Sequence, residues 1–245
     1  MDVYWLEQTQ SEVPSGDDWL SESEAVRLDS MRFEKRRADW RLGRWTAKHA
    51  LAAWLKLEPE TDVLRSIELR AQTSGAPEPY FGGRHAEVSI SLSHSSGVAM
   101  CAVAGKTAQL GCDLERIEQR SAAFVSDYFT LEEQRLIAGA STSKRLVANL
   151  IWSAKESALK ALKEGLRRDT RSVEVTFDNV SVGAPDRDRS WRVFYVTCGG
   201  ERRLQGWWQC EAELVRTLVA EPAPREPVRI AIPARTGNAA TAGTA

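Results

Sequence analysis

The sequence predicts an α+β protein made of two similar halves, each an antiparallel sheet packed against helices. Two observations support this prediction. Between residues 21 and 117 helical segments are followed by three strands, and from residue 121 onward the order of helices and then strands recurs. The composition is that of an ordinary globular protein, with 42% hydrophobic and 27% charged residues in a chain of 245. The order of elements suggests a structural duplication, although no sequence repeat is apparent.

The first half begins with a short strand predicted at residues 3–6. Ser21-Glu22-Ser23-Glu24 is a capping box, in which the serine hydroxyl caps a helix and the last glutamate reaches back to the cap. Helical character continues from there to about Leu57. A loop at residues 75–83, rich in glycine and proline, separates this segment from the strands. These strands are predicted at residues 88–92, 97–104 and 110–117.

The second half contains another capping box, Thr130-Leu131-Glu132-Glu133, and a long helix predicted over residues 143–164. Apolar residues recur every four positions along one face of this helix, at Leu146, Leu150, Ala154, Ala158 and Leu162. Four strands are predicted after it, at residues 173–177, 191–197, 203–210 and 212–219.

These elements divide the chain into an N-terminal half, residues 1–108, and a C-terminal half, residues 109–222. Residues 223–245 are rich in proline and then in glycine, alanine and threonine. Such a segment has few apolar groups to bury, so we predict that it is mostly disordered.

Charge and cysteine content exclude several classes of protein. The chain has 33 Lys and Arg against 34 Asp and Glu, a balance that argues against general coating of nucleic acid or an anionic membrane. It has no apolar run of about 18 residues, which a membrane span needs, and its acidic N-terminus is unlike a signal peptide. The four cysteines lack C-x-x-C spacing, so they predict neither a zinc site nor a disulfide framework and suit the reducing cytoplasm.

The first candidate site is Gly111-Cys112-Asp113-Leu114-Glu115. Side chains alternate along a strand, so Asp113 and Glu115 point to one face, where their charges repel unless a cation lies between them. Mg²⁺ prefers hard oxygen ligands and typically takes one or two protein carboxylates, leaving its other positions to water or phosphate. The alternative is a half-exposed strand with a solvated acidic face.

A second candidate site, Trp152-Ser153-Ala154-Lys155-Glu156, lies on the long predicted helix. Glu156 and Lys160 are four residues apart and share one helix face, so they could supply a third carboxylate and a cation for phosphate. Lys155, about 100° around the helix, could also bind phosphate. The alternative is a surface ion pair worth a few tenths of a kcal/mol.

Two further groups could bind phosphate. Ser93 and His94 lie at the end of a predicted strand, where their side chains can reach a ligand; for His94 the alternative is a solvent-facing turn residue. The helical segment before residue 57 is densely basic and includes Arg41 and Arg44, whose planar guanidinium groups suit bidentate contact with phosphate. The alternative there is a solvated charged face. The chain has neither a G-x-S-x-G elbow nor a P-loop, so a serine hydrolase and a P-loop kinase are disfavoured.

In this order and spacing, Ser93-His94, Gly111-x-Asp113-x-Glu115 and Trp152-x-x-Lys155-Glu156-x-x-x-Lys160 resemble the 4′-phosphopantetheinyl transferases of the type that activates surfactin synthetase. The resemblance covers roughly residues 25–180 and implies two α+β halves with the active site in the cleft between them. It also implies a monomeric, cytoplasmic enzyme. Such enzymes transfer the 4′-phosphopantetheine arm of coenzyme A to a serine of an acyl or peptidyl carrier protein and release adenosine 3′,5′-bisphosphate.

The resemblance also implies roles for the candidate residues. Asp113, Glu115 and Glu156 would bind Mg²⁺ against the pyrophosphate of coenzyme A, while Lys160 and Lys155 add positive charge at the same oxygens. Asp113, Glu156 and Lys160 are then the catalytic residues. Glu156 is either a metal ligand or the base that takes the proton of the carrier serine.

The 3′-phosphate of coenzyme A would be held by Ser93 and His94, with Arg41 or Arg44 as a second anchor. One departure concerns this end of the substrate. The family often has Gly-Lys-Pro before the Ser-His strand, whereas this chain has Gly75-Ala76-Pro77, so Arg70 or Arg84 would have to replace the lysine.

Two other functions stay open at this point. One is a non-catalytic protein that binds nucleotides or anionic partners through the basic helix, with a purely structural acidic pair. The other is a different Mg²⁺-dependent phosphotransferase. Neither a nucleic acid nor a membrane is expected as a partner.

Overall fold

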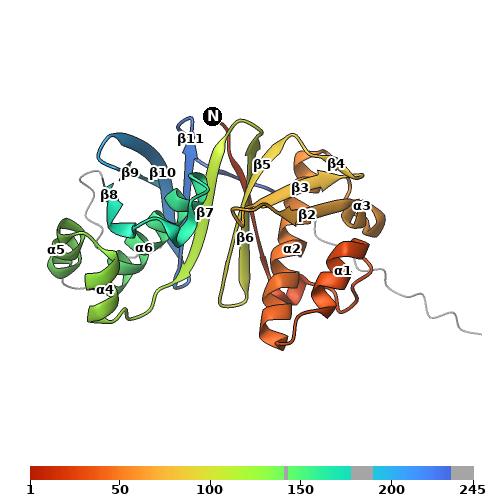
Figure 1. The fold of residues 1–245 in the computed structure, drawn as a ribbon, viewed down its shortest axis with the longest axis horizontal. Helices are drawn as coiled ribbons and strands as arrows, with labels where there is room; N and C mark the ends of the chain where they lie inside the picture. Colours follow the sequence, from red (N-terminus) through yellow and green to blue (C-terminus); the bar gives the residue numbers. More distant parts are fainter. Residues whose placement is uncertain (141–142, 178–189, 233–245) are drawn as a thin grey trace, which may run out of the picture.

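The computed structural model describes residues 1–140, 143–177 and 190–232 (Figure 1). Three sheets and several helices alternate along the chain, which confirms the predicted α+β class. The first sheet has the order β12-β1-β6-β5, with bounds Val228–Arg229, Tyr4–Thr9, Val98–Gly105 and Val88–Ser95. The second has the order β7-β11-β10-β9-β8, with bounds Gln109–Arg116, Leu214–Glu221, Arg202–Glu211, Arg192–Cys198 and Val173–Phe177. The third is β2-β3-β4, with bounds Ile67–Ala71, Pro77–Phe81 and Arg84–His85.

Among the described residues, three α-helices lie in the first half and three in the second. Their bounds are Glu22–Asp29 (α1), Glu34–Trp54 (α2), Thr61–Ser66 (α3), Ala122–Tyr128 (α4), Leu131–Gly139 (α5) and Lys144–Ala161 (α6). Both predicted capping boxes are confirmed, at the first turns of α1 and α5. Within the described residues, no helix is long and apolar enough to cross a membrane.

The two large sheets share one internal order. In the first half β1 precedes α1 to α3 and pairs antiparallel with the last strand, β6, which pairs with β5. In the second half β7 precedes α4 to α6 and pairs antiparallel with β11, which pairs with β10. Helix α2 packs on β1 and β6, and α6 packs on β7 and β11 (Figure 1). The predicted boundary between residues 108 and 109 lies between β6 and β7.

Helices α2 and α6 carry a sequence repeat that we did not detect in the sequence alone. Trp45-Thr46-Ala47-Lys48 of α2 corresponds to Trp152-Ser153-Ala154-Lys155 of α6, and Leu55-Lys56 corresponds to Leu162-Lys163, always 107 residues apart. The repeat is easily overlooked because it is short, with four consecutive residues inside each helix and two just after its end.

The junction of the halves is formed by β5 and β7, which lie next to each other in the middle of the molecule (Figure 1). They belong to different sheets, so no backbone ladder joins them. Instead, three serines at alternate positions of β5 bond toward β7: Ser91 and Ser93 to residues of β7 itself, and Ser89 to the turn that precedes it. Their hydrogen bonds are Ser89 Oγ to the carbonyl of Ala108 (2.9 Å), the Cys112 amide to Ser91 Oγ (2.9 Å), and Ser93 Oγ to Asp113 Oδ1 (2.8 Å).

Two predicted elements differ from the structure. The helical segment from residue 21 to 57 is two helices, because the chain turns at residues 30–33 and Arg37 Nη1 donates to the Leu28 carbonyl at the end of α1. The predicted loop at residues 75–83 contains strand β3. Strand β4 pairs only with Tyr80 and Phe81, so the two prolines of β3 lie on a free edge that needs no N–H donor.

The prediction of disorder is wrong for residues 223–232. Val228 and Arg229 form β12, which pairs parallel with β1, and the Ile230 amide donates to the Trp5 carbonyl at 2.8 Å. Ile230 and Ile232 are half-buried against the core of the first half. The proline content of this segment concealed two apolar anchors. The prediction for residues 233–245 lies outside the described residues.

Candidate active site

Strand β7 places Asp113 and Glu115 on one face, as predicted, and Asp113 is almost fully buried there. Helix α6 crosses this face at Gly111. A Cβ atom at Gly111 would lie 1.8 Å from the carbonyl oxygen of Ser157, a distance that no packing can accommodate. Glycine at this position therefore sets how closely α6 approaches β7, and with it the distance between Asp113 and the polar side chains of α6.

Lys160 of α6 reaches across to this acidic strand. Its Nζ donates to Asp113 Oδ1 at 2.7 Å and to the Cys112 carbonyl at 3.1 Å, and it lies 3.7 Å from Glu156 Oε2. Burial opposes the charge on Lys160, but Asp113 and Glu156 raise its pKa to about 12. The structure thus brings together Asp113, Glu156 and Lys160, and Lys160 stays positively charged.

The two carboxylate oxygens of Asp113 have different surroundings. Lys160 and Ser93 both donate to its Oδ1, whereas its Oδ2 is buried without a hydrogen-bond partner in the described part of the chain. A buried, unpartnered carboxylate oxygen is costly unless a ligand satisfies it. Ser93 therefore contacts and orients Asp113, one of the three carboxylates (Asp113, Glu115 and Glu156) that we call the acidic cluster. This contact was not predicted from the sequence.

Glu115 is held by two residues that flank it. Trp152 Nε1 donates to its Oε1 at 3.1 Å, and Arg120 Nη2 donates to its Oε2 at 3.0 Å. Arg120 is itself fixed by Asn149, whose Oδ1 accepts from its Nε at 2.8 Å. Burial and then the charge of Asp113 raise the pKa of Glu115. Sequence reasoning missed Arg120 and Asn149, since no spacing pattern links a loop arginine to a helix asparagine.

The three carboxylates of the acidic cluster outnumber the two cations that bond to them, Lys160 and Arg120. Burial, followed by the charge of Asp113, raises the pKa of Glu156 to about 7. Among the described residues, no group of three or more His, Cys, Asp or Glu side chains is arranged so that it could hold a metal ion. The chemistry of the donors nevertheless suits a hard divalent cation, because Asp113 Oδ2 is unpartnered and Mg²⁺ takes few protein carboxylates.

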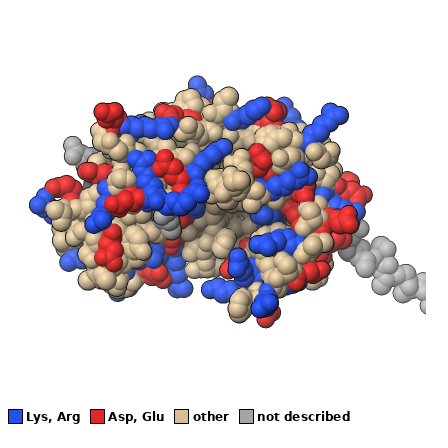
Figure 2. Space-filling model, in the orientation of Figure 1, with Lys and Arg blue, Asp and Glu red and all other residues tan. Residues whose placement is uncertain are grey.

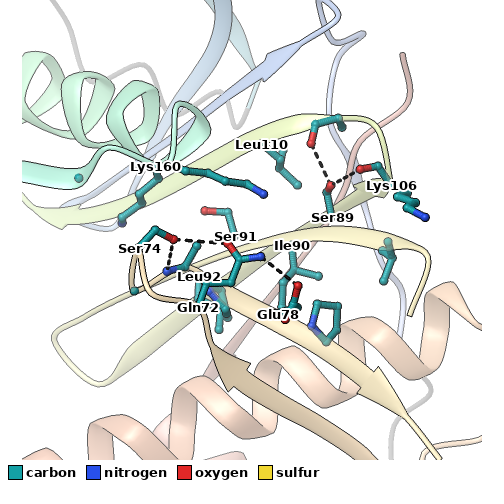
Figure 3. A pocket seen from close by; sticks show the side chains of 18 of the residues that line it. Gln72, Ser74, Glu78, Ser89, Ile90, Ser91, Leu92, Lys106, Leu110 and Lys160 are labelled. Carbon is teal, nitrogen blue, oxygen red and sulfur yellow. Dashed lines mark hydrogen bonds between the residues drawn. The ribbon is translucent and has the colours of Figure 1, made fainter. Parts of the chain in front are cut away.

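A cavity of about 460 Å³ opens beside this cluster, between the two halves (Figure 3). Residues 72–79 and strand β5 line one side, and Lys160, Lys163 and Gly165 line the other. In Figure 3 the Lys160 side chain extends toward Ser91 from the opposite wall. Figure 2 shows a hollow near the middle of this face, with basic side chains on both sides of it. The cavity is large enough to take part of a nucleotide-sized ligand.

Arg41 and Arg44 of the basic helix do not line this cavity. Arg41 pairs with Asp17 at 2.7 Å and donates to the Pro14 carbonyl at 2.5 Å, so it anchors the preceding loop. Arg44 lies 3.5 Å from Glu24 in a mostly buried position, where burial lowers its pKa. The structure therefore gives both arginines protein partners, and their predicted contact with phosphate stays a prediction.

His94 is exposed at the end of β5. Of the two arginines considered as replacements for the missing lysine, Arg70 pairs with Glu68 at 2.6 Å and stacks on the Tyr80 ring at 4.0 Å. Arg84 is exposed on β4. Ala76 and Pro77 do line the cavity, so the family's usual lysine position faces it.

The predicted role of Lys155 is not supported by its position. Its side chain is fully buried on the far side of α6, where Nζ pairs with Glu133 at 2.8 Å and donates to the carbonyls of Thr170 and Val173. Helical spacing placed Lys155 about 100° from Glu156 but could not show that this direction leads into the core. Lys155 therefore fixes α6 to its neighbours instead of facing the cavity.

The family model of the 4′-phosphopantetheinyl transferase superfamily matches residues 109–205. This range runs from β7 into β10 and contains Asp113, Glu115, Glu156 and Lys160. This part of the chain is therefore similar to the 4′-phosphopantetheinyl transferase superfamily. The predicted family is thereby confirmed, on the part of the chain that holds the acidic cluster.

Two comparisons with known proteins add to the family match. It is 28% identical over 168 residues to the 4′-phosphopantetheinyl transferase HetI of Nostoc sp., covering 66% of this chain and 68% of that protein. A crystal structure of a holo-(acyl-carrier-protein) synthase from Bacillus anthracis in complex with coenzyme A (3′,5′-ADP) matches with a TM-score of 0.36 and 21% identity. That match covers 42% of this chain and 92% of the other.

Proposed function

We infer that this protein transfers the 4′-phosphopantetheine arm of coenzyme A to a carrier protein. The match of residues 109–205 to the superfamily model and the similarity to HetI support the activity. The structural observation that carries it is the meeting of Asp113 and Glu156 with Lys160, which lines a cavity between the halves. The acceptor that we propose is a serine of an acyl or peptidyl carrier protein, and the second product is adenosine 3′,5′-bisphosphate.

We place the active site in the cleft between two pseudo-twofold-related halves of a single chain. The matched strand orders, the repeat in α2 and α6, and the cavity lined from both halves support this placement. Because one chain supplies every residue of the site, we propose that the enzyme acts as a monomer. All four cysteines are free thiols, which suits the proposed cytoplasmic location.

The metal that we propose is Mg²⁺. Asp113 and Glu156 would hold it, with Glu115 as the third carboxylate of the set. The unpartnered, buried Asp113 Oδ2 and the all-oxygen donor set support this choice. When bound, the metal would orient the pyrophosphate of coenzyme A and offset charge on the leaving phosphate.

The residues of the chain then have distinct tasks. Lys160 keeps a positive charge beside Asp113 and Glu156, where it can stabilise charge that develops on the phosphate oxygens. The carrier serine Oγ attacks the phosphorus that bears the pantetheine arm, and the bond from that phosphorus to the oxygen of the adenosine bisphosphate breaks. The serine proton passes to a base, and Glu156 is placed either for this role or as a metal ligand. His94 remains our candidate for contact with the 3′-phosphate.

Incubation of the protein with a fluorescent coenzyme A, Mg²⁺ and an apo carrier protein tests the function. We expect a labelled carrier whose mass rises by one phosphopantetheine arm, and no label on a carrier whose acceptor serine is replaced by alanine. Binding of coenzyme A without labelling of any acyl or peptidyl carrier tried would contradict transfer and favour a non-catalytic binding protein.

A further inference from the structure

We propose that Lys163 binds a phosphate group of coenzyme A and so supplies a substrate contact from the second half of the chain. This proposal rests on the proposed function and adds a residue to it. Lys163 follows the end of α6, is exposed, and lines the cavity together with Lys160.

The charged groups around the cavity single out Lys163. Five charged or titratable side chains line it, and four of them have partners. The pairs are Glu78 with His85 (3.2 Å), Lys106 with Glu87 (2.5 Å), and Lys160 with Asp113 (2.7 Å). In the described ranges, no hydrogen bond or ion pair engages the ammonium group of Lys163. Lys163 can therefore bind an anion without breaking an ion pair, whereas Lys106 and Lys160 are already paired with carboxylates.

The position of Lys163 suits a ligand with several phosphates. Lys160 reaches the acidic cluster, and Lys163 lies three residues further along the chain, just beyond the end of α6. Coenzyme A carries a pyrophosphate and, on its ribose, a 3′-phosphate. A molecule with its pyrophosphate at Asp113 and Glu156 and its adenosine end in the cavity would pass Lys163.

The alternative is that Lys163 only completes the C-terminal end of a helix, where a cation is favourable. The repeat provides a test of this alternative, because Lys56 holds the same position after α2. The two lysines have left-handed backbones, with φ of 57° at Lys56 and 58° at Lys163, and similar capping hydrogen bonds. Lys56 lines a separate cavity formed with the N-terminus and β12. A capping role predicts equal effects at both positions, whereas phosphate binding predicts an effect at Lys163 alone.

The experiment is calorimetric titration of coenzyme A and of 3′-dephospho-coenzyme A into the full-length protein with Mg²⁺ and without a carrier. The variants are Lys163→Ala, Lys163→Arg and the matched control Lys56→Ala, each with a measured melting temperature. We expect Lys163→Ala to weaken coenzyme A binding about 10-fold, as for loss of one charged hydrogen bond. Lys163→Arg should restore most of the affinity, and Lys56→Ala should leave it unchanged.

The dephospho substrate identifies the phosphate involved. Loss of affinity for coenzyme A alone assigns Lys163 to the 3′-phosphate, and loss for both ligands assigns it to the pyrophosphate. Unchanged binding by Lys163→Ala, or equal weakening by Lys56→Ala, overturns the proposal while the wild-type titration still supports the function. If the wild-type protein itself fails to bind coenzyme A, the proposed function falls, and the role of Lys163 falls with it.

Discussion

Lys155 of α6 and Glu133 of α5 form an ion pair of 2.8 Å in which both side chains are almost fully buried. Glu133 also closes the capping box of α5, and its Oε1 accepts from the Val175 amide of β8 at 2.9 Å. One carboxylate thus joins two helices and a strand of the second half.

The first half contains the same arrangement. Lys48 of α2 pairs with Glu24 at 2.6 Å, and Glu24 closes the capping box of α1. Its Oε1 accepts from the Leu69 amide of β2 at 3.2 Å. Two helices and a strand are joined in each half by a buried lysine and a capping-box glutamate, so the similarity between the halves extends from strand order to individual hydrogen bonds.

Replacing Lys155 by methionine should destabilise the protein, because Glu133 is left as a buried charge without its cation. We expect a loss of about 3–5 kcal/mol in the free energy of unfolding, measured with urea. The double variant Lys155→Met, Glu133→Gln should recover part of this loss. A variant with wild-type stability but a raised KM for coenzyme A would instead restore the phosphate-binding role predicted from the sequence.

Replacing Gly111 by alanine should push α6 away from β7, since the added methyl group has no room beside the Ser157 carbonyl. We expect a loss of about 1–3 kcal/mol or more in stability and a lower transfer rate. Gly139→Ala is the matched control, because nothing lies within 4 Å of a Cβ there. It should leave activity unchanged. Equal behaviour of the two variants would mean that the approach of α6 is not set by Gly111.

Replacing Asp113 by asparagine should abolish most transfer and leave the fold intact. The amide keeps the shape of the side chain but removes the charge that faces Lys160 and a divalent cation. We expect a rate at least about 100-fold lower, as for loss of an electrostatic stabiliser, with a melting temperature near that of the wild type. Transfer close to the wild-type rate at saturating Mg²⁺ would show that Asp113 is not part of the catalytic set.

Glu156→Gln separates the two roles open to this residue. If Glu156 is chiefly a metal ligand, the variant needs more Mg²⁺, and excess metal partly restores the rate. If it is chiefly the base, metal gives no rescue and the rate recovers only as pH rises. We expect metal rescue. In either case Lys160→Ala should slow transfer about 10- to 1000-fold. Full activity in both variants would mean that Glu156 and Lys160 form only an ion pair and take no part in transfer.

Removal of the segment that holds β12 should destabilise the first half. A chain ending at residue 226 loses Ile230, Ile232 and the pairing with β1, whereas a chain ending at residue 232 keeps them. We expect the shorter chain to be less stable by about 2 kcal/mol, from the apolar surface of two half-buried isoleucines. Identical melting temperatures for the two truncated chains would show that these contacts contribute nothing measurable.

Much of the acidic cluster could be predicted because its geometry is local. Strand alternation placed Asp113 and Glu115 on one face, and the four-residue spacing placed Glu156 beside Lys160. The same reasoning failed for Lys155, since helical spacing gives the angle between two side chains but not which of them faces the core. Nearly the whole of α6 is buried, so its polar residues have no solvent-exposed face that would mark the site.

Contacts between distant segments could not be predicted from spacing. The bonds from Arg120 and Trp152 to Glu115, and from Ser93 to Asp113, depend on how β5, β7 and α6 pack together. The tail was misjudged for a related reason. Its prolines indicate a lack of regular structure, but two residues are enough to extend a sheet whose edge strand is available.

The row of serines on β5 makes the two halves interdependent in evolution. Each half can accept substitutions independently only where it does not contact the other. Here the amide of Cys112 and the carboxylate of Asp113 depend on hydroxyl groups contributed by the other half. A chimera that joins the first half of one relative to the second half of another would need compatible residues on both strands, so these positions should change in pairs or not at all.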